Sequence, residues 1–113
     1  MIGGTKRLVA VKARIQDISR STTLSDPGGP TGLLLPNGVP AYRLNLIGTI
    51  VMGPEITDTC VTIAIDDGTG SLLIQSFDRP ELLEDTKIGQ VITVIGRPRQ
   101  HTDGISIAPE ITK

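Results

Sequence analysis

Hydrophobic and polar residues alternate with a period of two along most of this chain, which is typical of half-buried β-strands. The alternation is clearest in residues 60–65 (CVTIAI), 71–77 (SLLIQSF) and 105–111 (ISIAPEI). Residues 41–52 (AYRLNLIGTIVM) form a longer apolar segment, and residues 90–96 (QVITVIG) form another. The pattern therefore predicts five strands in the last two thirds of the chain.

Turn signals separate these strands. Asn37-Gly38 precedes the first strand, and Asp67-Gly68 predicts a tight hairpin between the second and third. Gly48 lies inside the first strand, where a glycine indicates a bulge or a sharp bend. We expect loops at residues 53–59 and, as the last hairpin loop, at residues 97–104 (RPRQHTDG).

Residues 78–87 carry the signals of a helix. Asp78 and Glu81 fit a capping box, and Pro80 suits a first turn, where its missing N–H costs little. Gly89 follows as a residue that can end the helix. The pattern predicts one short helix between the third and fourth strands.

The order of these elements predicts an all-β fold class. Three strands, one short helix and two further strands are the order of a five-stranded OB-fold barrel. We expect a single OB-fold domain over residues 1–113, with the barrel at 41–111 and an N-terminal strand and flexible loop at 1–40. Within that N-terminal part, residues 8–18 alternate like an extra strand, and residues 19–32, rich in Ser, Thr, Gly and Pro, predict a mobile surface loop.

Composition and charge narrow the function classes. The 13 Gly and 8 Pro among 113 residues argue against a helical bundle. The net charge of −1 argues against a broad, non-specific grip on nucleic acid. Residues 1–50, however, hold six basic and two acidic side chains, against five basic and ten acidic ones in residues 51–113. A local basic face therefore fits the sequence.

The sequence carries no pattern typical of a metal site, a disulfide or a membrane span. Cys60 and His101 are each the only residue of their type, so neither a disulfide within the chain nor a Cys- or His-rich zinc site is expected. The most apolar stretch, residues 44–52, is too short to span a bilayer, and the N-terminus lacks the pattern of a signal peptide. We expect no cofactor, no metal, no membrane and no secretion, with the chain in the cytoplasm (nucleoid-associated) or the nucleus.

Three segments resemble a known family. Residues 42–51 (YRLNLIGTIV), 65–70 (IDDGTG) and 94–111 (VIGRPRQHTDGISIAPEI) resemble the single-stranded-DNA-binding OB domains of replication protein A, especially archaeal small and middle subunits. Residues 12–18 (KARIQDI) resemble the N-terminal extension of the archaeal members, and the likeness covers at least residues 42–111. It implies a non-enzymatic single-stranded-DNA-binding subunit or domain whose partners are DNA and other replication protein A-like subunits. An oligomer or a heteromer is compatible with that family.

The resemblance also implies where DNA binds. The ligand face is expected on the second and third strands, framed by the loops after the first and fourth. Arg43 matches the basic residue at the start of the first strand, Phe77 the aromatic that ends the third, and Arg97 and Arg99 the basic pair after the fourth. Further candidates for nucleic-acid binding are Tyr42, Thr62 and Gln75.

This chain also departs from the family pattern. Relatives often carry basic side chains on the third strand, where this chain has Leu73 and Gln75, and an aromatic on the last strand, where it has Ser106. With Tyr42 and Phe77 as its only aromatics, stacking can supply ~1–3 kcal/mol for each base that stacks. One domain should then bind DNA with weak to moderate affinity.

Each candidate has a structural alternative. For Phe77 and Tyr42 the alternative is barrel packing, since aromatics pack more often than they stack on ligands. Arg97 and Arg99 are also compatible with a solvated loop. A basic strip on the extra strand is either a DNA contact or a solvent-facing side; its members are Lys6, Arg7, Lys12 and Arg14.

Two other function classes stay open. A structural OB module would mediate subunit assembly with little nucleic-acid contact, and an apolar assembly patch would distinguish it. An enzyme acting on nucleic acid would need a metal or acid–base cluster. Asp66 and Asp67 are neighbours on a strand end, so their side chains point to opposite faces, and turn chemistry accounts for both. Gly68-Thr69-Gly70 lacks the Gly-Lys-Ser/Thr that completes a phosphate-binding P-loop.

Overall fold

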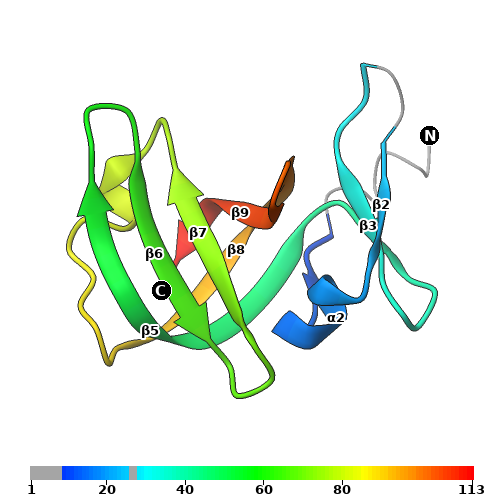
Figure 1. Ribbon diagram of the computed structural model, residues 1–113, viewed down its shortest axis with the longest axis horizontal. Coiled ribbons are helices and arrows are strands. Elements are labelled where there is room, and N and C mark those ends of the chain that lie inside the picture. Colours follow the sequence, from blue (N-terminus) through cyan, green and yellow to red (C-terminus); the bar gives the residue numbers. More distant parts are fainter. Residues whose placement is uncertain (1–8, 26–27) are drawn as a thin grey trace.

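The computed structural model describes residues 9–25 and 28–113, which form a barrel with an N-terminal extension beside it (Figure 1). Lys6 and Arg7, from the predicted basic strip, lie outside the described residues. No helix within the described ranges is long and apolar enough to cross a membrane.

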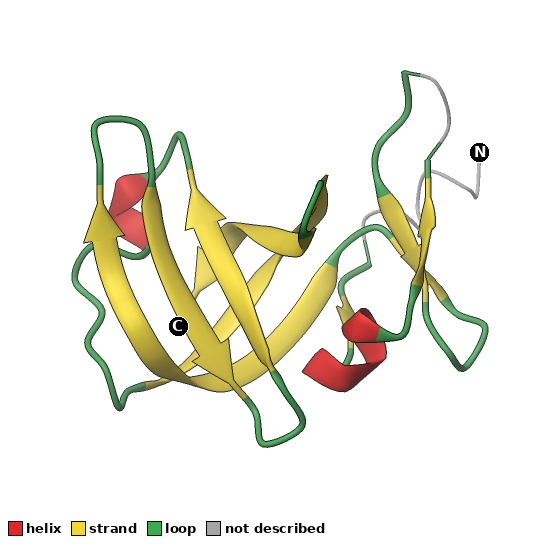
Figure 2. Ribbon diagram, viewed as in Figure 1, coloured by secondary structure: helices red, strands yellow, loops and turns green. Residues whose placement is uncertain are grey.

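Five strands close the barrel (Figure 2). They are β5 (Leu44–Ile56), β6 (Val61–Asp66), β7 (Ser71–Ser76), β8 (Val91–His101) and β9 (Gly104–Thr112). Their order is β5-β6-β7-β9-β8, and β8 pairs back onto β5. The β7–β9 pair is parallel, whereas β5–β6, β5–β8, β6–β7 and β8–β9 are antiparallel. This arrangement confirms the predicted OB-fold barrel.

Strand β5 closes the barrel because it pairs with two strands, β6 and β8. Its first half pairs with β8 and its second half with β6, and Thr49 has a register partner on each. At Gly48 a Cβ would lie 3.1 Å from the backbone oxygen of Asp66, so the glycine permits a close approach of two strands. The bulge predicted there is displaced, because the register shifts fall between Ile50 and Glu55. The strand also continues to Ile56, so the loop predicted from residue 53 is wrong in its first half.

The barrel interior is filled by the inward positions of the alternating strands. Leu72 and Ile74 of β7 are buried, while Leu73 and Gln75 face outward, as the pattern predicts. Further buried side chains of the barrel core are Leu44, Leu46, Ile50, Val61, Ile63, Ile65, Leu83, Ile92, Val94 and Ile107. Because the interior is aliphatic, the outward face of the same strands is free to carry polar and charged groups.

The predicted helix at residues 78–87 is wrong in length and in its cap. The structure has a single 3₁₀ turn, η1 (Pro80–Leu82), with Arg79 rather than Asp78 at its N-cap. The Thr86 hydroxyl donates to the Leu83 carbonyl oxygen at 2.6 Å, and the Lys87 N–H donates to a side chain instead. The local hydrogen bonds of a Thr side chain thus compete with a further helical turn.

The predicted strand at residues 8–18 is replaced by two short elements. Strand β1 (Val11–Lys12) pairs in parallel with β5, and helix α2 (Ile15–Ser19) follows. Ile15 and Ile18 are three residues apart and both buried, which places them on one helical face. Arg14 stands at the N-cap of this helix, where Asp17 accepts its backbone N–H at 3.2 Å.

Part of the segment predicted as a loop at residues 19–32 forms strands instead. Strands β2 (Thr22–Leu24), β3 (Gly32–Leu34) and β4 (Pro40–Ala41) form a separate three-stranded sheet. The predicted Asn37-Gly38 turn joins β3 to β4, with Gly38 at φ +86°. Leu33 and Ala41 are buried in the common core, so this sheet packs against the rest of the molecule.

Candidate nucleic-acid interface

The outer face of β7, β9 and β8 gathers most of the predicted site residues. Leu73 on β7 is the register partner of Ser106 on β9, and Ser106 is the partner of Arg99 on β8. One row therefore crosses three strands. Gln75 is the register partner of Thr62 on β6, which extends the same face onto a fourth strand.

Phe77 and Arg99 meet on this face. Phe77 follows the end of β7 and is 44% exposed, so the barrel interior does not hold its ring. The Arg99 guanidinium carbon lies 5.2 Å from the ring centroid, within the range of a cation–π contact. The pair exposes both an aromatic ring and a planar cation, the two kinds of surface on which bases stack.

Arg97 and Arg99 lie in a strand, which corrects the predicted loop. Strand β8 continues to His101, and the chain turns only at Thr102 and Asp103. Being two residues apart, both arginines point to the same face, while Pro98 between them is buried and faces Ile107. The two guanidinium groups are therefore anchored on a paired strand.

Glu110 joins several arginines into one cluster. Its carboxylate accepts Arg43 Nε at 2.7 Å through one oxygen and lies 3.2 Å from Arg97 Nε through the other. Arg79 Nη1 donates to the Glu110 carbonyl oxygen at 3.2 Å and also pairs with Glu81. The arginine cluster comprises Arg43, Arg79, Arg97 and Arg99. Arg79 was not predictable from the sequence, because its neighbour on β9 is 31 residues away.

A small pocket lies beside the Phe77 ring, between the end of β7 and β9. Its volume is about 70 Å³. It is lined by Gln75, Ser76, Phe77, Asp78, Arg79, Arg99, Ala108 and Pro109. Within the described part of the chain, the Gln75 amide and the Asp78 carboxylate have no hydrogen-bond or ion-pair partner.

Tyr42 and Thr62 are placed differently from Phe77. A Cβ at Gly32 would lie 2.5 Å from Tyr42 Cε1, so the tyrosine ring packs on the N-terminal sheet. Thr62 is half-buried, and its hydroxyl lies 3.4 Å from the sulfur of half-buried Cys60. Of these two residues, Thr62 remains next to the candidate site.

The IDDGTG hairpin holds the N-terminal extension. Asp67 Oδ2 accepts the Ile15 N–H at 2.8 Å, and the Thr69 hydroxyl oxygen accepts the Gln16 N–H at 3.0 Å. The other Asp67 oxygen accepts the Thr69 N–H and hydroxyl within the turn. Both bonds to the extension satisfy N–H groups that a helix start leaves unpaired. The hairpin thus caps α2 from 52 residues away.

The pKa of Asp67 is lowered from its ordinary value of 3.8. Burial acts in the opposite direction and would raise the pKa, but the hydrogen bonds from the Thr69 hydroxyl and from the Ile15 and Thr69 N–H groups together outweigh it. Asp66 accepts the Gly68 N–H at 2.7 Å. Both carboxylates are therefore engaged in the turn, as predicted. In residues 9–25 and 28–113, no group of three His, Cys, Asp or Glu side chains is placed to hold a metal ion.

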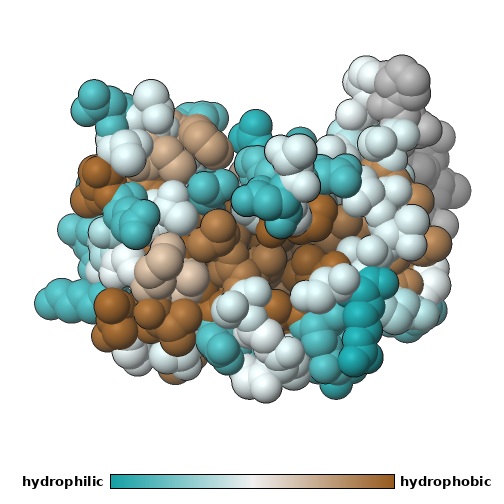
Figure 3. Space-filling view, viewed as in Figure 1, coloured by the Kyte–Doolittle hydropathy of each residue, from teal (hydrophilic) through white to brown (hydrophobic). Residues whose placement is uncertain are grey.

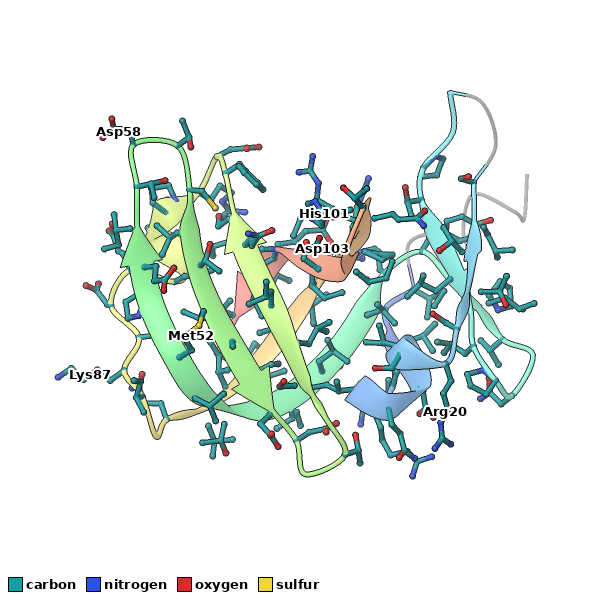
Figure 4. The ribbon with its side chains drawn as sticks, viewed as in Figure 1. Arg20, Met52, Asp58, Lys87, His101 and Asp103 are labelled. Carbon is teal, nitrogen blue, oxygen red and sulfur yellow. The ribbon has the colours of Figure 1, made fainter. Side chains whose placement is uncertain are left out.

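A hollow separates the barrel from α2. It measures about 370 Å³ and is lined by Ile18, Leu72, Leu73 and Ile105, with Asp103 at its edge. Figure 3 shows it as hydrophobic surface between the barrel and the N-terminal extension. His101 and Asp103 stand beside it at the β8–β9 turn (Figure 4), and His101 Nε2 lies 2.7 Å from the Ser106 hydroxyl.

Solved structures resemble this fold closely. A chain of a replication protein A heterotrimer bound to ssDNA has a TM-score of 0.75 and 14% identity, over 93% of this chain and 80% of that one. A chain of the S. pombe Stn1–Ten1 complex has a TM-score of 0.77 and 15% identity, over 93% and 77%. No family model and no curated protein matches the sequence. The strand order and these neighbours define the chain as an OB-fold barrel with an N-terminal extension.

Proposed function

We propose that this chain is a non-enzymatic, single-stranded-DNA-binding OB-fold subunit or domain of a replication protein A-like complex, of the archaeal small or middle subunit type. The observation that carries the proposal is the exposed Phe77–Arg99 pair within the arginine cluster. It lies at the third strand of the barrel and beside the last hairpin, where OB folds bind oligonucleotides. The likeness to chains from two heteromeric complexes and the sequence motifs support it. Such a chain would work in the cytoplasm, on the nucleoid, or in the nucleus.

Different residues of the site make different contacts with a bound DNA strand. Phe77 stacks a base, and Arg97 and Arg99 bind phosphates, because guanidinium groups bind phosphate in a bidentate way. Arg43 is only 21% exposed and holds Glu110, so it positions Arg97 more than it meets DNA itself. Gln75 and Thr62 add polar contacts beside the ring, while Tyr42 supports the N-terminal sheet.

The affinity of this chain alone should be modest. One exposed ring supplies ~1–3 kcal/mol of stacking, and ordering a flexible strand costs part of that gain. Linking several such domains turns later binding events into intramolecular ones and raises the overall affinity. The chain is therefore suited to act together with other OB-fold subunits, as an oligomer or a heteromer.

The site is tested by two variants and one control. Phe77→Ala removes the stacking ring, and Arg99→Glu reverses the charge above it. Each should raise the Kd for a fluorescein-labelled oligothymidine about tenfold or more in an anisotropy titration, since one stacked base is worth ~1–3 kcal/mol. Lys87→Glu reverses an exposed charge away from the pair and should leave the Kd within about twofold (Figure 4). Equal loss in all three, or none in the first two, would refute this assignment.

A second candidate function, subunit assembly with little DNA contact, is favoured by an exposed apolar patch. Ile47, Val51 and Val91 are 57%, 48% and 69% exposed and line one hollow on the outer side of β5 and β8. Contiguous apolar surface of this kind is typical of protein interfaces. If a replication protein A-like subunit covers the patch, Val91→Lys should abolish co-sedimentation with that subunit and Lys87→Glu should not. Unchanged co-sedimentation of Val91→Lys would exclude the patch as the interface.

A further inference from the structure

The pocket beside Phe77 contains a carboxylate, that of Asp78, to which the proposed function gives no role. Neither the Asp78 carboxylate nor the Gln75 amide has a partner among the described residues. The Ser76 hydroxyl is different, because it donates to the Arg79 carbonyl oxygen at 2.8 Å. Two uncommitted side chains thus face the same small space.

The size of the pocket restricts what enters it. Its volume is about 70 Å³, against about 370 Å³ for the hollow between the barrel and α2. A whole base does not fit in that space, but the edge of a base does. A base stacked on the Phe77 ring would remain outside the pocket and direct one edge into it. Asp78 follows Phe77 directly in the chain, so its carboxylate lies close to that edge.

The charge of Asp78 selects which part of a nucleotide it meets. A carboxylate only accepts hydrogen bonds and repels phosphate, so it favours the donors of a base edge. The phosphates are attracted instead to the arginine cluster, whose Arg43 and Arg97 gather around Glu110. The site therefore places a carboxylate that suits a base edge next to arginines that suit phosphates, and Arg79 and Arg99 of the cluster line the pocket as well.

We infer that this pocket prefers guanine among the four DNA bases and that Asp78 is the residue that determines this specificity; the inference rests on the proposed function. On its Watson–Crick edge guanine presents N1–H and the N2 amino group side by side, which match the two oxygens of one carboxylate. Adenine and cytosine present one amino group there and thymine one N–H, so each gives a carboxylate a single donor. The Gln75 amide can donate to the neighbouring guanine O6.

The test compares oligothymidines that differ at one central base. Guanine, adenine, cytosine, thymine or hypoxanthine is placed there, and the Kd is measured by fluorescence anisotropy with the full chain. Guanine should bind on the order of tenfold more tightly than the other three DNA bases, as expected for a bidentate contact. Hypoxanthine is the matched control on the DNA side, because it differs from guanine only in lacking the N2 amino group. An oligothymidine with hypoxanthine should therefore lose most of the affinity that guanine gains over the other bases.

Two variants complete the test. Asp78→Asn replaces one acceptor with a donor and should abolish the guanine preference while thymine binding stays within about twofold. Asp85→Asn makes the same change in charge at an exposed position outside the pocket and should keep the preference. Equal affinity for all bases, or an unchanged preference in Asp78→Asn, would overturn the inference and leave the proposed function intact. Binding to none of the oligonucleotides would overturn the proposed function, and the inference with it.

Discussion

At the scale of single residues, one carboxylate connects the two parts of the molecule. Asp67 bonds to its own turn through one oxygen and to the start of α2 through the other. Sequence analysis predicted the first role, because Asp-Gly turns follow local rules. The second was not predictable, since the Ile15 N–H that it accepts lies 52 residues earlier.

The lowered pKa of Asp67 predicts a pH dependence of stability. A folded-state pKa below the unfolded value means that the ionised carboxylate stabilises the fold at pH values above 3.8, and that this contribution is lost as the pH falls through the lowered pKa. Asp67→Ala should cost about 1 kcal/mol at neutral pH, as expected for the loss of a helix cap. Urea unfolding at pH 7 and about pH 3 measures this, and the difference between wild type and variant should shrink at the lower pH. A constant difference, or an equal effect of Asp58→Ala at an exposed turn, would contradict this role.

At the scale of elements, the regularly alternating strands were predictable and the short N-terminal elements were not. Polar and apolar residues alternate over six residues in both β6 and β7, so the pattern predicts where each strand lies and which side chains point inward. Helix α2 has only five residues, and its stability depends on tertiary packing of Ile15 and Ile18. Because the polar and apolar residues of this short segment also alternate, the sequence pattern alone predicts a strand there.

The end of β8 shows why part of the candidate site was misplaced. Residues 97–104 contain Pro98, Asp103 and Gly104, which are common in loops, and few apolar residues. Pro98 nevertheless occupies the inward position opposite Ile107, so the alternation continues through it. Proline donates no ladder hydrogen bond, yet β8 contains a proline at this position. Arg97 and Arg99, predicted in a loop, therefore lie on a strand.

At the scale of the whole molecule, the net charge hides how the charges are arranged. The chain carries 11 basic and 12 acidic side chains, yet Arg43, Arg79, Arg97 and Arg99 gather on one face of the barrel. Glu110 and Glu81 compensate only part of that cluster. Its attraction to phosphate should act at short range, because salt screens charges over about 8–10 Å at physiological ionic strength.

The most direct test of the account is an anisotropy titration of the unmodified chain with a labelled oligothymidine at about 50 and about 200 mM salt. We expect saturable binding that weakens with salt. If Arg97 and Arg99 each contact a phosphate, log K should fall with log salt at a slope of about −1.4, at roughly −0.7 for each single-strand phosphate neutralised. Absence of binding at the lower salt concentration would contradict the central claim and leave the barrel as an assembly module.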